Sequence, residues 1–251
     1  GDTWDARRPF VVGRLVEPQY GGAGEGVRAS VEQDLLSSDQ MIEPMVIDGF
    51  DVTAALVATG NWLSGYNERT SEAPYVFGTP GGGSVPGSKA SNVGEVFSTV
   101  TGWSWIYVIA AHAVNATTVT ISNAADSTSF TAPVVNIEIN GNTVAIALED
   151  RTSSTMTSTL EVVVTWDNGG GYVDEVVGTM TTAGDYLAWL FRQTNQLVDY
   201  AKVNDARATL KAYSIGTYVD DPVVITDYIR ETLLDMLPIS MMTGARGIYP
   251  L

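Results

Sequence analysis

The sequence predicts a β-rich α+β fold, in which antiparallel sheets or barrel-like domains precede a helical C-terminal segment. Three observations predict it. Residues 103–166 hold short runs of apolar and β-branched residues at the two-residue period of strands. Asn140 and Gly141 separate two such runs, and an Asn-Gly pair in that setting is the strongest short signal for an antiparallel hairpin. After the glycines at 169–171 the apolar spacing changes to that of a helix.

The first strands are expected close to the N-terminus, at residues 10–16 and 27–33. In the second run apolar and polar residues alternate, which is typical of a half-buried strand. Residues 17–26 lie between the two runs and contain four glycines and a proline, so they predict a loop or a wide turn. Residues 50–63 fit either a strand or a short helix, and the pattern leaves both open.

Residues 71–102 form the strongest break in the pattern, because glycines, prolines and serines gather there. Within this stretch, residues 74–88 predict an extended arm or an inter-subunit loop. Its apolar part, Tyr75-Val-Phe77, is surrounded by turn-forming residues and would expose apolar surface if nothing covered it.

The remaining elements follow from the period of the apolar residues. Strands are expected at 105–114, 117–122, 134–139, 143–148 and 160–166. Helices are expected at 184–199, 203–213 and 222–237. Pro222 and Pro238 bound the last of these helices, which is the usual punctuation of a helix.

These elements predict three segments along the chain. Residues 1–72 are expected to be a β-rich segment that enters an inserted domain. Residues 73–168 are expected to be a β-rich domain that carries the Gly/Pro arm at 74–88. Residues 169–251 are expected to be an α-rich segment that is incomplete at its C-terminus.

Charge and composition limit the classes of function. The chain has 251 residues, enough to bury a sizeable core, and only 17% of them are charged, against about 25% in an average protein. There are 13 basic and 29 acidic residues, a net charge of −16, and the excess acid is spread along the chain. No basic patch is present to neutralise phosphates, so neither sequence-specific nucleic-acid binding nor attraction to an anionic membrane is expected. No apolar run is long enough for a membrane span.

The sequence offers few candidates for chemistry. It contains no cysteine, which excludes disulfides and thiolate sites, and its one histidine excludes multi-histidine metal sites. His112 lies inside an apolar run, where a satisfied core or interface histidine is favoured over a catalytic one. The pairs Asp174-Glu175 and Asp220-Asp221 can in principle act in acid–base chemistry or bind calcium, but capping and turn roles are favoured. We therefore predict no catalytic, cofactor-binding or metal-binding residues.

Aromatic residues are plentiful, with six tryptophans and eleven tyrosines. Trp103 and Trp105 are two residues apart and are expected to point to one face of a strand. Aromatic clusters bind sugars or form protein interfaces, and ordinary core packing explains the same pattern equally well. The sequence leaves these interpretations open.

Three stretches together resemble the baseplate or tail hub proteins of long-tailed bacteriophages and gene transfer agents. The first is Trp4-Asp-Ala-Arg-Arg-Pro-Phe-Val-Val-Gly-Arg-Leu-Val16, followed by a Tyr-Gly-Gly loop. The second is Tyr75-Val-Phe-Gly-Thr-Pro-Gly81 leading into Ile106-Tyr-Val-Ile-Ala-Ala-His-Ala-Val114, although Ala111 stands where the family pattern has glycine. The third runs from Asp221 to Pro238 and into Ile239-Ser240.

The resemblance implies a structural role. Such hubs form a ring, usually threefold, that closes the tail tube and joins it to tip or fibre proteins, with a passage for DNA ejection. The expected partners are therefore copies of the chain itself and the tail tube, distal tail and tip or fibre proteins, and the expected location is the tail tip of a virion. No enzymatic activity and no cofactor are expected.

Two other classes stay open. A secreted or surface β-sandwich for adhesion or carbohydrate binding is the main alternative, because of the Thr-rich strands, the aromatics and the acidity. A hydrolase that uses Asp or Glu pairs is a third hypothesis, which rests on the number of carboxylates alone.

Overall fold

The computed structural model describes residues 14–20, 27–32, 40–67, 69–82, 86–123, 128–151, 161–166, 172–174, 178–194, 196–233, 235, 237–244 and 246–251. In these residues antiparallel strands dominate and helices α1 to α4 join them, so the predicted β-rich α+β class is confirmed. No helix in these ranges is long and apolar enough to cross a membrane.

The chain divides into two compact units. The barrel unit comprises Ile42–Tyr186 and Leu210–Val223, and the helical unit comprises Gly1–Met41, Leu187–Thr209 and Val224–Leu251. These units group residues by contact and not by sequence order. The three-segment organisation expected from the sequence stays a prediction.

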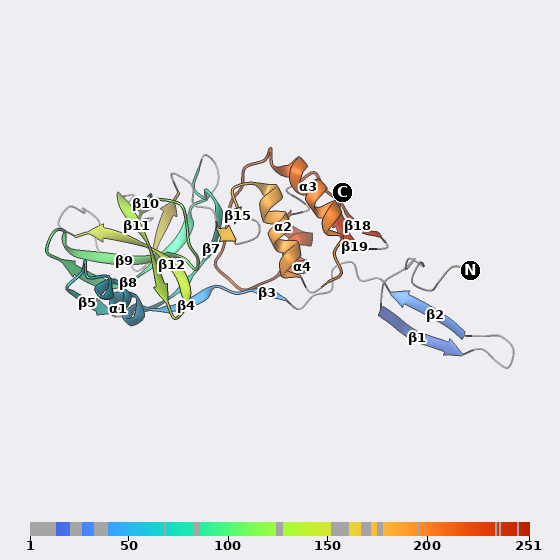
Figure 1. The fold of residues 1–251 in the computed structure, drawn as a ribbon, viewed down its shortest axis with the longest axis horizontal. Coiled ribbons are helices and arrows are strands. Elements are labelled where there is room, and N and C mark those ends of the chain that lie inside the picture. Colours follow the sequence, from blue (N-terminus) through green and yellow to red (C-terminus); the bar gives the residue numbers. More distant parts are fainter. Residues whose placement is uncertain are drawn as a thin grey trace. The chain divides into compact units, whose positions relative to one another are not determined.

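A seven-stranded antiparallel sheet, in the order β13-β10-β11-β12-β9-β8-β5, forms most of the barrel unit (Figure 1). Because β13 also pairs with β8, six of the strands close into a barrel, and β5 pairs with the other half of β8. This closure pairs the first strand of the sheet with β8, whereas β5 pairs with β8 alone. The seven strands are β5 (Ser64–Asn67), β8 (Ser88–Ser98), β9 (Gly102–Ala110), β10 (Thr118–Ser122), β11 (Ser129–Ile139), β12 (Asn142–Asp150) and β13 (Glu161–Thr165).

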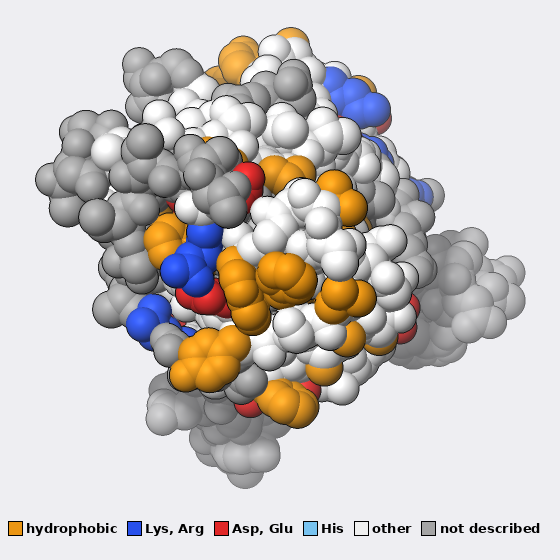
Figure 2. All heavy atoms as spheres, turned by 90° about the vertical axis from the view of Figure 1, so that its left-hand side faces the viewer, with side chains coloured by type: hydrophobic (Ala, Val, Ile, Leu, Met, Phe, Trp, Pro, Cys, Tyr) orange, Lys and Arg blue, Asp and Glu red, His pale blue; other side chains and the backbone are white. Residues whose placement is uncertain are grey.

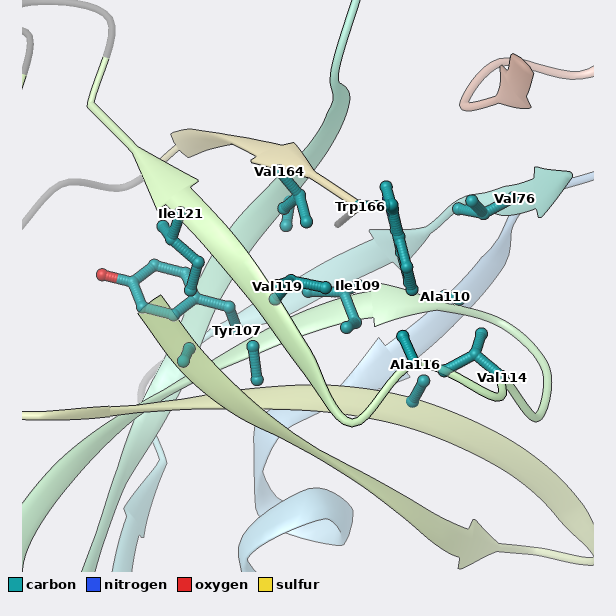
Figure 3. Close-up of a cluster of buried hydrophobic side chains, with 14 of the residues drawn as sticks. Val76, Tyr107, Ile109, Ala110, Val114, Ala116, Val119, Ile121, Val164 and Trp166 are labelled. Carbon is teal, nitrogen blue, oxygen red and sulfur yellow. The ribbon is translucent and has the colours of Figure 1, made fainter. Parts of the chain in front are cut away.

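Strand β9 shows why two cores exist. Its side chains alternate between the faces of the sheet, so Tyr107 and Ile109 join the core inside the barrel, whereas Ile106 and Val108 join a second core outside it. Figure 3 shows Tyr107 and Ile109 among the side chains of the inner core, with residues of β10 and β13 around them. A strand buried on both faces reads as a continuous apolar run, which is what the sequence shows at this position.

Helix α1 (Gly49–Ala58) covers the outer core with Val52 and Leu56, both fully buried. The helix starts at Asp48, whose carboxylate accepts a hydrogen bond from the Phe50 N–H at 2.8 Å and so caps the first turn. It packs so closely on β5 that a Cβ atom on Gly65 would lie 2.7 Å from the Cβ of Thr53. The structure thus decides the ambiguity at residues 50–63 in favour of a helix.

The remaining strands of the chain are short. Near or within the barrel unit they are β3 (Met41–Ile42), β4 (Met45–Asp48), β6 (Thr70–Ala73), β7 (Tyr75–Gly78), β14 (Val173–Asp174), β15 (Gly178–Thr179), β16 (Gly216–Val219) and β17 (Val223–Val224). Strand β4 pairs with β6, β7 with β16, and β14 with β15, all antiparallel.

The helical elements follow in the last third of the chain. They are α2 (Ala183–Gln193), α3 (Tyr200–Leu210), α4 (Ile225–Tyr228) and a π-helical turn at Ile229–Leu233. Two hairpins belong to the helical unit, β1 (Arg14–Tyr20) with β2 (Val27–Glu32) and β18 (Met241–Gly244) with β19 (Gly247–Pro250). In this unit Leu187, Leu190 and Phe191 of α2 are fully buried, as their helical spacing predicts.

The hairpin at Asn140-Gly141 is confirmed. The two residues have φ of 52° and 80°, the left-handed conformation of both central residues in a type I′ turn, and Ile139 pairs with Asn142 across it. This turn joins β11 to β12 in the middle of the sheet.

Several expectations for element positions are wrong in part. The helix expected at 184–199 ends at Gln193, and Leu197 is exposed. The strand expected at 105–114 ends at Ala110, and the strand expected at 134–139 begins at Ser129. The first strand is Arg14–Tyr20 and not residues 10–16, of which only 14–16 are described, and Pro18 lies where the register of β1 shifts, a place that tolerates a missing N–H. The helix expected from Pro222 begins only at Ile225, because Val223-Val224 form a strand first.

The arm expected at residues 74–88 is also corrected. Its first part is β7, which pairs with β16 inside the barrel unit, and Val76 and Phe77 are fully buried. Its last residue, Ser88, begins β8. The apolar stretch is therefore covered by this chain itself, and residues 83–85 lie outside the described part.

Candidate functional site

The lone histidine lies in a cluster of aromatic rings in the barrel unit. His112 follows β9 and is 4% exposed, and its ring lies 5.8 Å from that of Tyr75, 6.5 Å from that of Phe77 and 4.6 Å from that of Tyr172. Its Nε2 accepts a hydrogen bond from the Val76 N–H at 2.8 Å. Nδ1 therefore carries the proton and donates to the Ala113 carbonyl at 3.0 Å.

Both ring nitrogens of His112 are used by the backbone, and the ring is neutral. Burial lowers the pKa of His112 to about 4, and the hydrogen bond to the Ala113 carbonyl opposes this shift in part. Nε2 can accept the Val76 N–H only while it is unprotonated. The geometry is that of the satisfied core histidine favoured by the sequence.

The same cluster joins two distant parts of the sequence. Residues 75–78 come as β7 and residues 111–114 follow β9, and the Ala111 N–H donates to the Pro74 carbonyl at 2.9 Å beside the His112 contact. Gly78, with φ of 66°, ends β7 where the Thr79 N–H donates to the Ile215 carbonyl. These are the two halves of the second stretch that resembles the hub family.

The carboxylate pairs considered in the sequence are described in part. Asp220 forms an ion pair with Lys89 at 3.0 Å, which raises the pKa of the Lys89 ammonium. With Asp221 and Glu72 they line a polar cleft of about 280 Å³ in the barrel unit. Asp174 lies in β14, and its neighbour Glu175 lies outside the described residues. Among the residues that the structure describes, no group of three or more acidic or histidine side chains is placed to hold a metal ion.

An aromatic face lies on the inward side of the sheet at the β8–β9 hairpin. Facing residues of antiparallel strands share a face, and Tyr66, Glu95 and Trp105 face one another across β5, β8 and β9. Phe97 and Trp103 form the next row, with ring centroids 5.4 Å apart. We call the five side chains, together with Arg151, the aromatic face.

The sequence predicted that Trp103 and Trp105 share a face of a strand, and the register confirms it. Trp103 is 38% exposed and Tyr66 is 56% exposed, so this face is not a closed core. Figure 2 looks onto this end of the molecule and shows hydrophobic side chains gathered on it, with a basic side chain lying on an acidic one among them.

A charged pair is built into the aromatic face. Glu95 accepts a hydrogen bond from the Trp105 Nε1–H at 2.9 Å through one oxygen and from Arg151 at 2.7 Å through the other. The guanidinium carbon of Arg151 lies 5.3 Å from the centre of the Trp105 ring, a cation–π distance. The sequence alone did not indicate Glu95 or Arg151 as site residues. The contact between them depends on the strand register, which cannot be read from a single sequence.

A fully buried carboxylate lies next to this pair in the sheet register. Glu149 is fully buried and accepts a hydrogen bond from the Tyr107 hydroxyl at 2.8 Å. It faces Trp105 across β12 and β9. One signal for it was present in the sequence, since Glu149 keeps the two-residue period of the inward-facing Ala145 and Ala147.

No protein-family model, curated protein or solved structure matches this chain.

Proposed function

We propose that this chain is a structural subunit of a phage tail tip, a hub that forms a ring, closes the tail tube and joins it to tip or fibre proteins. The observation that carries the proposal is the His112 cluster. The two halves of the hub-like motif pack on each other through the Val76–His112 hydrogen bond and the stacked Tyr75 ring. A motif that forms one packed unit is stronger support than two short matches at unrelated places in the fold.

The barrel suits such a role physically. Closure of six strands leaves fewer edges for uncontrolled pairing, which matters for a subunit present in several copies close together. The alternative of a β-sandwich adhesin fits the architecture less well, because the sheet closes into one barrel instead of stacking as two sheets.

The test is assembly. Sedimentation velocity and electron microscopy of the purified chain are expected to show a ring, threefold in the family that it resembles, and antibodies raised against the chain should label the tip of isolated tails. A chain that stays monomeric at high concentration and does not label tails would contradict the proposal. The matched control is an antibody against a tail tube protein, which should label along the tube.

A further inference from the structure

The aromatic face combines exposed apolar rings with a charged pair. Its rings present flat apolar surface, with Tyr66 56% exposed and Trp103 38% exposed. Among them lies a carboxylate–guanidinium pair whose Arg151 side chain is 40% exposed and whose Glu95 side chain is 26% exposed. An occupant must satisfy both.

The charged pair is held in place before any ligand arrives. Glu95 is fixed by the Trp105 indole and by Arg151, and Arg151 lies over the Trp105 ring. A carboxylate has about four acceptor positions and a guanidinium five N–H donors, so both groups retain capacity for further hydrogen bonds. Groups fixed in this way bind with little loss of side-chain entropy.

An apolar protein side chain fits this pair poorly. Covering Glu95 and Arg151 with apolar surface removes their water without replacing its hydrogen bonds, which costs free energy. An anionic ligand also fits poorly, because the charge of Arg151 is already neutralised by Glu95 and the whole chain carries a charge of −16.

A neutral sugar ring fits both properties. One face of a pyranose carries C–H bonds, which are attracted to the negative face of an aromatic ring, and its rim carries hydroxyls that both donate and accept. We propose that the aromatic face binds a neutral saccharide, which stacks on Trp103 and Tyr66 while its hydroxyls hydrogen-bond to Glu95 and Arg151.

Tyr66 and Trp103 are exposed on this face, so a single chain is expected to bind weakly, with a Kd on the order of 1 mM. The inference goes beyond the hub role and does not rest on it, because it concerns the isolated chain. The two proposals can fail independently: the assembly test can show a ring on a chain that binds no saccharide, and the titration can show saccharide binding by a chain that forms no ring.

The test is calorimetric titration of the whole chain with four neutral hexasaccharides, cellohexaose, chitohexaose, maltohexaose and mannohexaose, and with anionic polygalacturonate. At least one neutral sugar is expected to bind, and polygalacturonate is not. Trp103→Ala is expected to weaken binding about tenfold, the scale of one stacked ring. Phe50→Ala is the matched control, because Phe50 is an exposed aromatic on α1, which covers the opposite face of the sheet, and it should bind as the wild type does.

Circular dichroism of each variant checks that the fold is retained. Failure of all four neutral sugars to bind, an unchanged affinity of Trp103→Ala, or a preference for polygalacturonate would each overturn the proposal. Self-association of the wild-type chain that Trp103→Ala abolishes would overturn it too, since a second copy would then occupy the face.

Discussion

The two faces of the sheet at the β8–β9 hairpin are made by alternate residues of the same strands, yet they differ in almost every property. On one face Val96 and Ile106 are fully buried in the outer core beneath α1. On the other, the neighbouring Phe97 and Trp105 are only partly buried, and Trp103 is exposed. One residue along the chain separates a sealed aliphatic contact from an open aromatic surface.

The difference shows that one face of the sheet can stabilise the fold while the other remains free to bind. The face under α1 can contribute stability because a helix removes it from water. The aromatic face gives up part of that contribution, since its rings stay in solvent and its Glu95–Arg151 pair keeps water. Side chains that contribute little to stability and remain exposed are suited to binding. The two faces should therefore respond differently to mutation.

The largest effect is expected on the sealed face. Leu56→Ala removes a fully buried side chain of α1 from the outer core and should reduce the free energy of unfolding by about 2–5 kcal/mol. Urea denaturation monitored by circular dichroism measures the loss. A change below about 1 kcal/mol would mean that α1 does not seal this face in solution.

A pH titration tests the burial of His112, which lies just after β9. The pKa of His112 is lowered to about 4 in the folded chain from 6.5 in the unfolded one, so the unfolded state binds a proton first. The stabilising effect of the neutral ring is complete above pH 6.5 and is lost as the pH falls toward 4, by about 3 kcal/mol in total.

The matched control for the titration is His112→Gln. Its amide can accept from the Val76 N–H and donate to the Ala113 carbonyl but does not titrate. Comparing urea midpoints of the two proteins between pH 4 and 7 isolates the histidine. Equal slopes in both proteins would show that His112 is not buried in its neutral form.

On the open face, Trp103→Ala should cost only about 1 kcal/mol of stability, which is the scale of its ring contact with Phe97. The measurement is the same urea titration as for Leu56→Ala. If the tryptophan variant lost as much stability as the leucine variant, the two faces would contribute equally to folding, contrary to this prediction.

A smaller effect is expected from the charged pair. Glu95→Gln should reduce stability by at most about 1 kcal/mol, because ion pairs near the surface are screened by solvent. A double-mutant cycle with Arg151→Gln measures the coupling between the two side chains. Coupling well above 1 kcal/mol would show that the pair is shielded from water, which contradicts a solvated binding face.

Neither face should retain double-stranded DNA. Aromatic rings beside an arginine are a common device for binding nucleic acid, but Arg151 is paired with Glu95 and the chain carries −16 charges. Gel-shift assays at low salt, where screening is weakest, are expected to show no shift. Tight, salt-sensitive retention would contradict both this prediction and the proposal of a hub that lets DNA pass.

The elements that sequence predicts well here depend on neighbours in the chain. The Asn140-Gly141 turn is local chemistry, since both residues accept positive φ, and the helical spacing of Leu187, Leu190 and Phe191 is local periodicity. Trp103 and Trp105 share a face because the alternation of a strand demands it. Each of these follows from fewer than a dozen consecutive residues.

The parts that sequence did not predict depend on pairing between distant residues. Nothing near Tyr75-Val-Phe77 indicates that residues 216–219 form a strand against it, so its apolar side chains were expected to stay uncovered. Likewise Glu95 and Arg151 meet only through the register of β8, β9 and β12. Contacts of this kind need the three-dimensional fold or the variation of many related sequences.

Closure of the barrel has a consequence for how the chain folds. Strands β11 and β12 are joined by a two-residue turn, and β8 and β9 by a short one, so these hairpins can form early and locally. The closing contact brings Glu161 to Ser91, far apart in the chain, and the strand that makes it is the last of the barrel to be synthesised. Long-range pairing of this kind carries the larger loop-closure entropy, so we expect docking of β13 to limit the folding rate. Until it docks, the inner core around Trp166 stays open to water, and the period before closure is when the newly made chain is most exposed to aggregation.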